Sequence, residues 1–197
     1  MSTITGTKGA RTKTVAPRPT AFKAQIHHMR GTSDLIDQVI VVVSEEALAY
    51  TRRSGLDGFL AQMYSATPMQ TLETERKGVS ADFLADLAKR MELPYVRLAT
   101  LLGISKATAA RKSAANALID GTAVVGMVKL LSIAQEIVDD STSPEAKNFD
   151  TVKWLGQWME RPQPALGGRR PSEFLDSPTG VAIVSKVLGA MRSGAYQ

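Results

Sequence analysis

Beyond residue 80, hydrophobic positions recur every three or four residues along the chain, the spacing of amphipathic helices. The first such stripe consists of Phe83, Leu84, Leu87, Ala88 and Met91. Ser80 stands before the stripe as a candidate N-cap, and Asp82 suits the positive end of a helix dipole. We therefore predict a helix that begins after Ser80.

Further helices come at short intervals. Pro94 suits the first turn of a second helix, which Gly103 ends. Ser105 is the expected cap of a third helix over residues 106–119, and a fourth is expected over 122–138. Because proline and polar residues fill positions 141–148, we place a domain boundary there.

The last part of the chain is also predicted to be helical. A helix is expected over residues 149–159, and Pro171 begins a further short turn. Ser177 and Pro178 form an N-cap followed by a proline at the first helical position, and Gly194 is placed to close that helix.

The residues before position 80 give a weaker pattern. A β-branched run over 39–43 favours a short strand, and Ser44 favours a helix that extends to about Arg53. Two glycines, Gly55 and Gly58, are expected to interrupt the structure of the next segment.

Composition argues against several kinds of enzyme. The 197 residues include no cysteine, and His27 and His28, the two histidines, are adjacent. Zinc hydrolases, cysteine nucleophiles and Ser-His-Asp triads need separated imidazoles or thiolates. Acidic pairs such as Asp139-Asp140 are routine on helix faces, and nothing in the pattern orients them toward a nucleophile or a metal. We expect no catalysis, no metal and no cofactor.

No apolar run approaches the roughly 18 to 20 residues that span a bilayer, and the first residues lack the apolar core of a secretory signal. We therefore expect a soluble cytoplasmic protein that does not enter a membrane. The net charge of +5 is concentrated in residues 1–30, which hold six basic residues and no acidic one. We call this segment the basic tail and expect it to be disordered, either as a solubilising leader or as an arm that contacts DNA phosphates.

The stretch RLATLLGISKATAARK has the spacing of a helix-turn-helix. Ala99 is small where two helices approach, Gly103 permits the turn, and Ile104 fills the junction. We expect Ala107 or Ala109, together with Ala110, to face the partner helix. The candidate DNA-binding residues are Ser105, Lys106, Thr108, Arg111 and Lys112. Arg111 suits a base contact, and the two lysines suit phosphates. An ordinary helical core with a solvated basic face would show the same pattern.

The order of motifs after residue 149 resembles a known domain. WL at 154–155, ALGG at 165–168, RRPSEFL at 169–175 and TG at 179–180 resemble the toxin-binding domain of Xre/MbcA/ParS-type antitoxins over residues 149–197. The preceding LPYVRLATLLGISKATAARK is similar to the Xre-type domain of that family. The resemblance implies a mainly α fold. A helical domain over 31–140 would hold the helix-turn-helix at about 80–140, followed by a small helical toxin-binding domain.

The resemblance also implies a function. Such antitoxins belong to type II toxin-antitoxin systems, and the usual partner is a RES-type toxin that degrades NAD. The antitoxin covers the active-site region of that toxin and binds operator DNA to regulate its own production, which we expect it to do as a homodimer. An alternative is a dimeric helix-turn-helix regulator without a toxin partner.

Glycine, arginine and aromatic side chains of the C-terminal part are the candidate toxin contacts. Rigid turns lower the ordering cost of binding, and arginine and aromatic side chains are favoured at interface hot spots. The glycine at 180 would allow close approach of another backbone, and Asp176 or the Gln197 carboxylate could imitate the charge of a pyrophosphate. The candidates are Trp154, Gly167, Gly168, Arg169, Arg170, Asp176, Gly180, Arg192, Tyr196 and Gln197.

Overall fold

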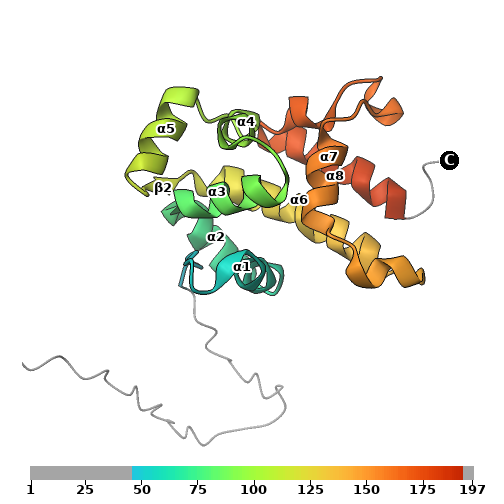
Figure 1. Ribbon diagram of the computed structural model, residues 1–197, viewed down its shortest axis with the longest axis horizontal. Coiled ribbons are helices and arrows are strands. Elements are labelled where there is room, and N and C mark those ends of the chain that lie inside the picture. The colour runs from blue at the N-terminus through green and yellow to red at the C-terminus, as the bar shows by residue number, and fades with distance from the viewer. Residues whose placement is uncertain (1–45, 193–197) are drawn as a thin grey trace, which may run out of the picture. The chain divides into compact units, whose positions relative to one another are not determined.

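A computed structural model describes residues 46–192, and these residues form a mainly helical fold (Figure 1). A helix-turn-helix part is followed by a C-terminal helical part, which confirms the expected fold class. Several predictions lie outside the described residues: the disordered basic tail, the strand over 39–43, the closing Gly194, and the candidate contacts Tyr196 and Gln197.

The helices and strands succeed one another with short connections. The helix-turn-helix part contains α1 (Gly55–Tyr64), α2 (Pro68–Lys77), β1 (Val79–Ser80), α3 (Ala81–Arg90), α4 (Tyr95–Leu101), α5 (Lys106–Ala114), β2 (Leu118–Ile119) and α6 (Gly121–Asp139). The C-terminal part contains α7 (Thr151–Met159) and α8 (Pro178–Arg192), with short 3-10 helices η1 (Pro144–Asn148), η2 (Pro164–Leu166) and η3 (Pro171–Phe174).

Helix α6 is shared by both parts of the fold. It packs against α1 and α2 of the helix-turn-helix part and against α7 and α8 of the C-terminal part (Figure 1). Its buried side chains include Met127, Leu130 and Leu131. One hydrophobic core therefore runs from Leu87 and Leu98 through α6 to Leu155 and Leu188. The domain boundary that we expected at residues 141–148 stays a prediction.

By length and composition, α6 is apolar enough to cross a membrane. The expectation that no segment has these properties is therefore wrong for this helix. Its apolar residues have another explanation, because Val124, Met127 and Ala134 are buried against neighbouring helices. Core helices of soluble proteins pass the same test of length and composition.

The predicted N-caps of three helices are confirmed. The side-chain oxygen of Ser80 accepts a hydrogen bond from the backbone N–H of Asp82 at 3.2 Å. Ser105 accepts one from Thr108 at 3.3 Å, and Ser177 accepts one from Gly180 at 3.2 Å. Each cap satisfies a backbone donor that the first turn of a helix leaves free.

The helix predicted from Ser44 to about Arg53 is wrong for the described residues, because residues 46–51 have no helical structure. Tertiary contacts hold this segment instead. The ring of Tyr50 packs edge-on to Phe59 and Phe83, each with centroids 5.6 Å away. Helix α1 then begins at Gly55 and includes Gly58, so these glycines do not interrupt structure as expected.

The third predicted helix is too long, because α5 ends at Ala114 rather than at residue 119. Asn116 has a positive φ of 43°, which turns the chain away from the helix axis. Leu118 and Ile119 then pair in an antiparallel ladder with Ser80 and Val79, respectively. This ladder holds the segment between α5 and α6 against the residues that precede α3.

Candidate functional site

The helix-turn-helix is built on a left-handed glycine between α4 and α5. Gly103 has φ 74°, and its N–H donates to the carbonyl of Thr100 at 3.1 Å. The N–H of Ile104 donates to Ala99 at 2.9 Å, which completes a Schellman motif. Ala99 is fully buried. The predicted roles of Ala99 and Gly103 are therefore confirmed.

Helices α3 and α5 end in the same way as α4, each at a residue with a positive φ. At the end of α3, Glu92 takes the left-handed position with φ 57°, and Leu93 donates to the carbonyl of Ala88 at 2.9 Å. At the end of α5, Asn116 takes this position, and Ala117 donates to Lys112 at 2.9 Å. These closed helix ends fix the directions of α4 and α5.

Helix α5 presents most of its surface to solvent. Ala109 is the buried residue of this helix, and the Tyr95 hydroxyl donates to its carbonyl at 3.2 Å. Ala110 is exposed, so the prediction that it packs inward is wrong. The exposed face carries Lys106 and Arg111, for which the described residues provide no ion pair.

The remaining candidates for DNA contact are partly engaged within the chain. The Lys112 ammonium donates to the carbonyl of Leu118 at 2.8 Å, so this lysine fastens α5 to β2. Ser105 and Thr108 share a hydroxyl hydrogen bond of 3.0 Å at the helix start. Lys106 and Arg111 are therefore the better placed of the five for contact with another molecule.

In the C-terminal part, Trp154 is half-buried within an aromatic row. Its ring stacks on Trp158 with centroids 6.0 Å apart and an angle of 19°, and it meets Phe149 at 6.1 Å. Trp158 is buried, whereas Phe149 is 43% exposed. Trp154 thus joins the core to an exposed aromatic edge.

A closed loop carries the paired glycines. The N–H of Gln163 donates to Arg169 at 3.0 Å, and its carbonyl accepts from Gly168 at 3.0 Å. Gly167 and Gly168 both have positive φ, 64° and 79°, which favours glycine. Neither would meet an atom within 4 Å if it carried a Cβ. Backbone conformation rather than close packing therefore accounts for these glycines.

The two arginines after this loop are held by carboxylates. The Arg169 guanidinium pairs with Glu173 at 3.0 Å and lies 4.5 Å from the centroid of the Phe174 ring. Arg170 lies 3.6 Å from Glu160, which also binds Arg97 of α4 through two hydrogen bonds of 3.0 Å. Both arginines are exposed, and each has a carboxylate partner that favours the position described.

Glu173 organises this loop. Its carboxylate accepts from the backbone N–H of Arg170 at 3.0 Å, as well as from the Arg169 side chain. The backbone hydrogen bond and then that of the arginine side chain hold the pKa of Glu173 below its usual value.

Two other candidates have roles in packing. Gly180 is buried, and a Cβ there would overlap with the carbonyl oxygen of Phe174. The close approach is thus made by the backbone of the same chain. Arg192 pairs with Glu136 at 2.5 Å and with Asp140 at 2.6 Å, so it fastens the end of α8 to α6.

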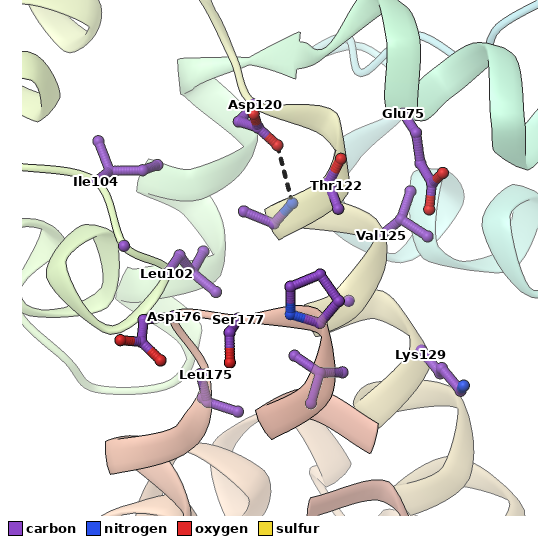
Figure 2. A pocket seen from close by; sticks show the side chains of 15 residues that line it. Glu75, Leu102, Ile104, Asp120, Thr122, Val125, Lys129, Leu175, Asp176 and Ser177 are labelled. Carbon is purple, nitrogen blue, oxygen red and sulfur yellow. Dashed lines mark hydrogen bonds between the residues drawn. The ribbon is translucent and has the colours of Figure 1, made fainter. Parts of the chain in front are cut away.

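Asp176 lies where the two parts of the chain meet. A Cβ on Gly103 would lie 3.4 Å from its carbonyl oxygen. Beside this contact is a cavity of about 530 Å³, which we call the junction cleft (Figure 2). Its lining consists of Glu75, Leu102, Gly103, Ile104, Asp120, Thr122, Ala123, Val125, Gly126, Lys129, Leu175, Asp176, Ser177, Pro178 and Val181.

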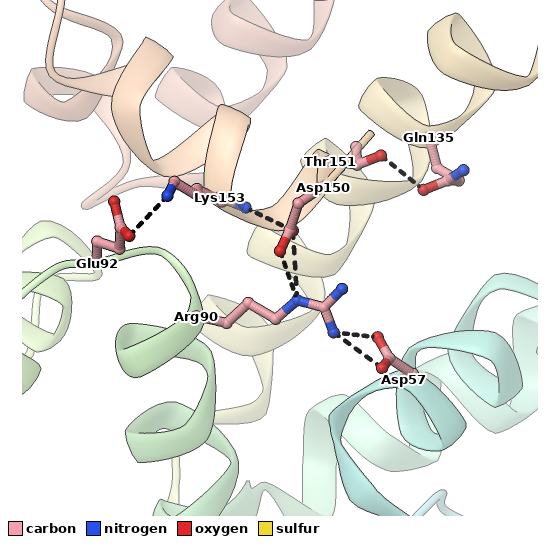
Figure 3. A network of polar contacts seen from close by, with 7 residues as sticks. All are labelled: Asp57, Arg90, Glu92, Gln135, Asp150, Thr151 and Lys153. Carbon is pink, nitrogen blue, oxygen red and sulfur yellow. Dashed lines mark hydrogen bonds and ion pairs between the residues drawn. The ribbon is translucent and has the colours of Figure 1, made fainter. Parts of the chain in front are cut away.

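A polar network that the sequence pattern did not reveal joins three segments (Figure 3). Arg90 of α3 pairs with Asp57 of α1 at 2.6 Å and with Asp150, the N-cap of α7, at 3.1 Å. Nearby, Lys153 pairs with Glu92 at 2.8 Å. The partners are 33 and 60 residues from Arg90 in sequence, so no local motif could have indicated them.

Within residues 46–192 there is no group of three or more histidine, cysteine, aspartate or glutamate side chains that could hold a metal ion. The described residues thus form a helix-turn-helix that is joined through α6 to a small helical domain.

Comparison with known proteins gives the same division. Residues 70–122 match the antitoxin Xre-like helix-turn-helix domain, and residues 146–194 match the antitoxin Xre/MbcA/ParS C-terminal toxin-binding domain. The chain is 32% identical over 137 residues to the Prs ADP-ribosylating antitoxin of Sphingobium sp. (strain YBL2), an alignment that covers 68% of this chain and 85% of that protein. The chain belongs to the Xre/MbcA/ParS antitoxin family.

This result confirms the resemblance found in the sequence. The protein is a non-enzymatic antitoxin of a type II toxin-antitoxin system, and it binds its toxin through the C-terminal domain. The alternative of a regulator without a toxin partner is wrong, since the matched C-terminal domain is a toxin-binding one.

Proposed function

We propose that this antitoxin inhibits an NAD-consuming toxin by covering its active-site region with the C-terminal domain. The observation that carries the proposal is the match of residues 146–194 to a toxin-binding domain, within which Arg169 and Arg170 are exposed yet held in place. A surface held in this way loses little conformational entropy when a partner binds.

Two reactions are compatible with NAD consumption. The sequence resemblance implies a RES-type toxin that degrades NAD. The name of the Sphingobium relative instead refers to ADP-ribosylation, a reaction in which NAD donates ADP-ribose. The relative's name favours transfer of ADP-ribose as a second candidate activity of the toxin.

An assay with purified toxin separates these two activities. The toxin is incubated with NAD that carries a label on its adenylate part, and both free nicotinamide and labelled protein are measured. Nicotinamide release with label in small molecules indicates degradation, whereas label on protein indicates transfer. Addition of the full antitoxin chain should suppress either signal. If the toxin leaves NAD intact in the presence of cell extract, the proposal is wrong.

We also propose that residues of the C-terminal surface contact the toxin, with Arg169 and Arg170 as polar anchors and Trp154 at an aromatic edge. Asp176 is exposed and supplies a carboxylate beside the junction cleft. Gly180 and Arg192 support this surface indirectly, because they hold α8 against η3 and α6.

For the helix-turn-helix we propose operator binding by a homodimer in the cytoplasm. The support is the exposed basic face of α5, on which Lys106 and Arg111 have no ion pair among the described residues. Pairing of two copies would place two such helices on successive half-sites. Fluorescence anisotropy with DNA from the antitoxin's own promoter tests this proposal. Equal affinity for promoter DNA and for unrelated DNA would contradict it.

A further inference from the structure

The junction cleft is formed by both parts of the chain. The turn of the helix-turn-helix supplies Leu102, Gly103 and Ile104, and the beginning of α6 supplies another wall. The C-terminal side of the cleft is closed by residues 175–178 and Val181, of which Figure 2 labels Leu175, Asp176 and Ser177. These last residues lie within 146–194, the segment matched to the toxin-binding domain. The cleft is therefore continuous with the surface of the toxin-binding domain.

The cleft has apolar walls that lie close together. Val125 and Gly126 of α6 line the cleft together with Val181 of α8. A Cβ on Gly126 would lie 3.3 Å from a methyl carbon of Val181, so α6 and α8 already approach closely there. These apolar side chains offer a surface against which the aliphatic stem of a long side chain could pack.

Carboxylates stand on different sides of this apolar space. Figure 2 shows Glu75 from the end of α2, Asp120 at the start of α6, and Asp176 before α8 around the opening. None of the three forms an ion pair with another described residue. Asp120 accepts the N–H of Ala123 at 3.2 Å as the cap of α6, which leaves Glu75 and Asp176 as the freer charges.

We propose that the cognate toxin inserts an arginine or lysine side chain into the junction cleft. The proposal rests on the toxin-binding function described above and extends it. The aliphatic stem of the basic residue would lie along Val125 and Val181, and its cationic end would be attracted by the carboxylates at the opening of the cleft. Lys129 also lines the cleft, but its single positive charge is outnumbered by the three carboxylates of Glu75, Asp120 and Asp176, so the lining favours a cation over an acidic group.

The proposal has a structural consequence. Leu102 and Ile104 belong to the helix-turn-helix, and Glu75 belongs to α2. A toxin side chain in the cleft therefore contacts both matched domains, so the toxin interface extends beyond residues 146–194.

Two kinds of variant test the cleft in the full chain. The Glu75→Gln/Asp176→Asn double variant removes the charges with little change in shape. Thr122→Arg places a basic side chain at the cleft from an exposed position on α6 and should compete with that of the toxin. The matched controls are Glu46→Gln/Glu145→Gln and Thr142→Arg, which change exposed residues that do not line the cleft.

The measurement is the dissociation constant for purified toxin at low and high salt, with thermal unfolding as a check of folding. We expect each cleft variant to bind about tenfold more weakly or worse, and the double variant to lose part of its salt dependence. The controls should stay within about twofold of the wild type. Wild-type affinity in both cleft variants would overturn the proposal.

Other results identify a different occupant or a different failure. If deletion of residues 1–30 strengthens toxin binding in the wild type but not in Thr122→Arg, the basic tail occupies the cleft and the proposal is wrong. If the cleft variants change self-association and not toxin affinity, a second copy occupies it, and the proposal is again wrong.

Failure of the inference differs from failure of the proposed function. If Arg169→Ala weakens toxin binding while the cleft variants do not, the toxin binds the C-terminal surface without the cleft. If the wild-type chain does not bind the toxin at all, both proposals fail.

A unique cysteine gives an independent check, because the chain has no cysteine of its own. Thr122→Cys should cross-link to a toxin segment that contains the inserted basic residue, and cross-links that map elsewhere would contradict the proposal.

Discussion

On α5 the side chains of Lys106 and Arg111 have no ion pair among the described residues, whereas Arg169, Arg170 and Arg192 each pair with a carboxylate. A free cation keeps its rotamers and can adapt to a phosphate backbone. An arginine paired with a carboxylate loses part of that freedom and offers a more defined shape to a partner. The difference supports the proposal that α5 binds DNA, whereas the C-terminal domain binds a folded toxin.

The largest expected effect concerns the rigidity of the C-terminal surface. Gly180→Ala would force its Cβ against the carbonyl of Phe174, and the resulting shift of α8 should cost about 3 kcal/mol of unfolding free energy. Urea denaturation measures this cost. The control is Gly189→Ala in the same helix, where a Cβ meets no atom within 4 Å and should be neutral or stabilising. Equal stability of both variants would show that α8 is not held as tightly as described.

A second prediction concerns the held arginines. Arg169→Ala removes both the ion pair with Glu173 and the contact with the Phe174 ring. We expect the affinity for toxin to fall by about 2 kcal/mol, because arginines in fixed positions are common hot spots. Isothermal titration calorimetry measures this change. Arg111→Ala should leave toxin binding unaltered, and an equal loss in both variants would remove the distinction between the two surfaces.

The free cations of α5 lead to a third prediction. Arg111→Ala should weaken promoter binding by about 1 to 2 kcal/mol and relax its sequence preference, whereas Lys106→Ala should weaken binding to all DNA and lower the salt slope. Anisotropy titrations over a range of salt concentrations measure both effects. If Arg169→Ala weakens DNA binding as much as Arg111→Ala, the basic face of α5 is not the main DNA contact.

The smallest expected effect is a pH dependence. The pKa of Glu173 is held below its usual value of 4.5 by the N–H of Arg170 and the side chain of Arg169. Its stabilising contribution is therefore fully present above about pH 4.5 and is lost as the pH falls through the lower, folded-state pKa. The difference in melting temperature between the wild type and Glu173→Gln should be constant near neutrality and shrink in acid. A difference that grows in acid would contradict this assignment.

The sequence was sufficient where structure is decided locally. Ser80, Ser105 and Ser177 were found because a cap depends on a few adjacent residues. The turn at Gly103 was found for the same reason. Non-local contacts were not found. The end of α5 depends on pairing of residues 118–119 with 79–80, which no local pattern shows.

The candidate site was predicted as a set of residues but not as an arrangement. The glycines and arginines after residue 163 were predicted to form a binding surface. The sequence did not show that Glu173 and Glu160 pair with the two arginines. Nor did it show that Gly180 and Arg192 serve packing. Side chains of these types occur in both roles, and only their neighbours in space distinguish them.

Helix α6 has a consequence for how such antitoxins diversify. Since its buried residues are packed by α1 and α2 as well as by α7 and α8, this helix belongs to both halves of the chain. In a chimera that joined the N-terminal half of this chain to the C-terminal half of a relative, the side chains of α6 would not fit those of the helices from the other protein. New toxin specificity is therefore easier to reach by altering the surface loops around Arg169 than by recombining whole modules.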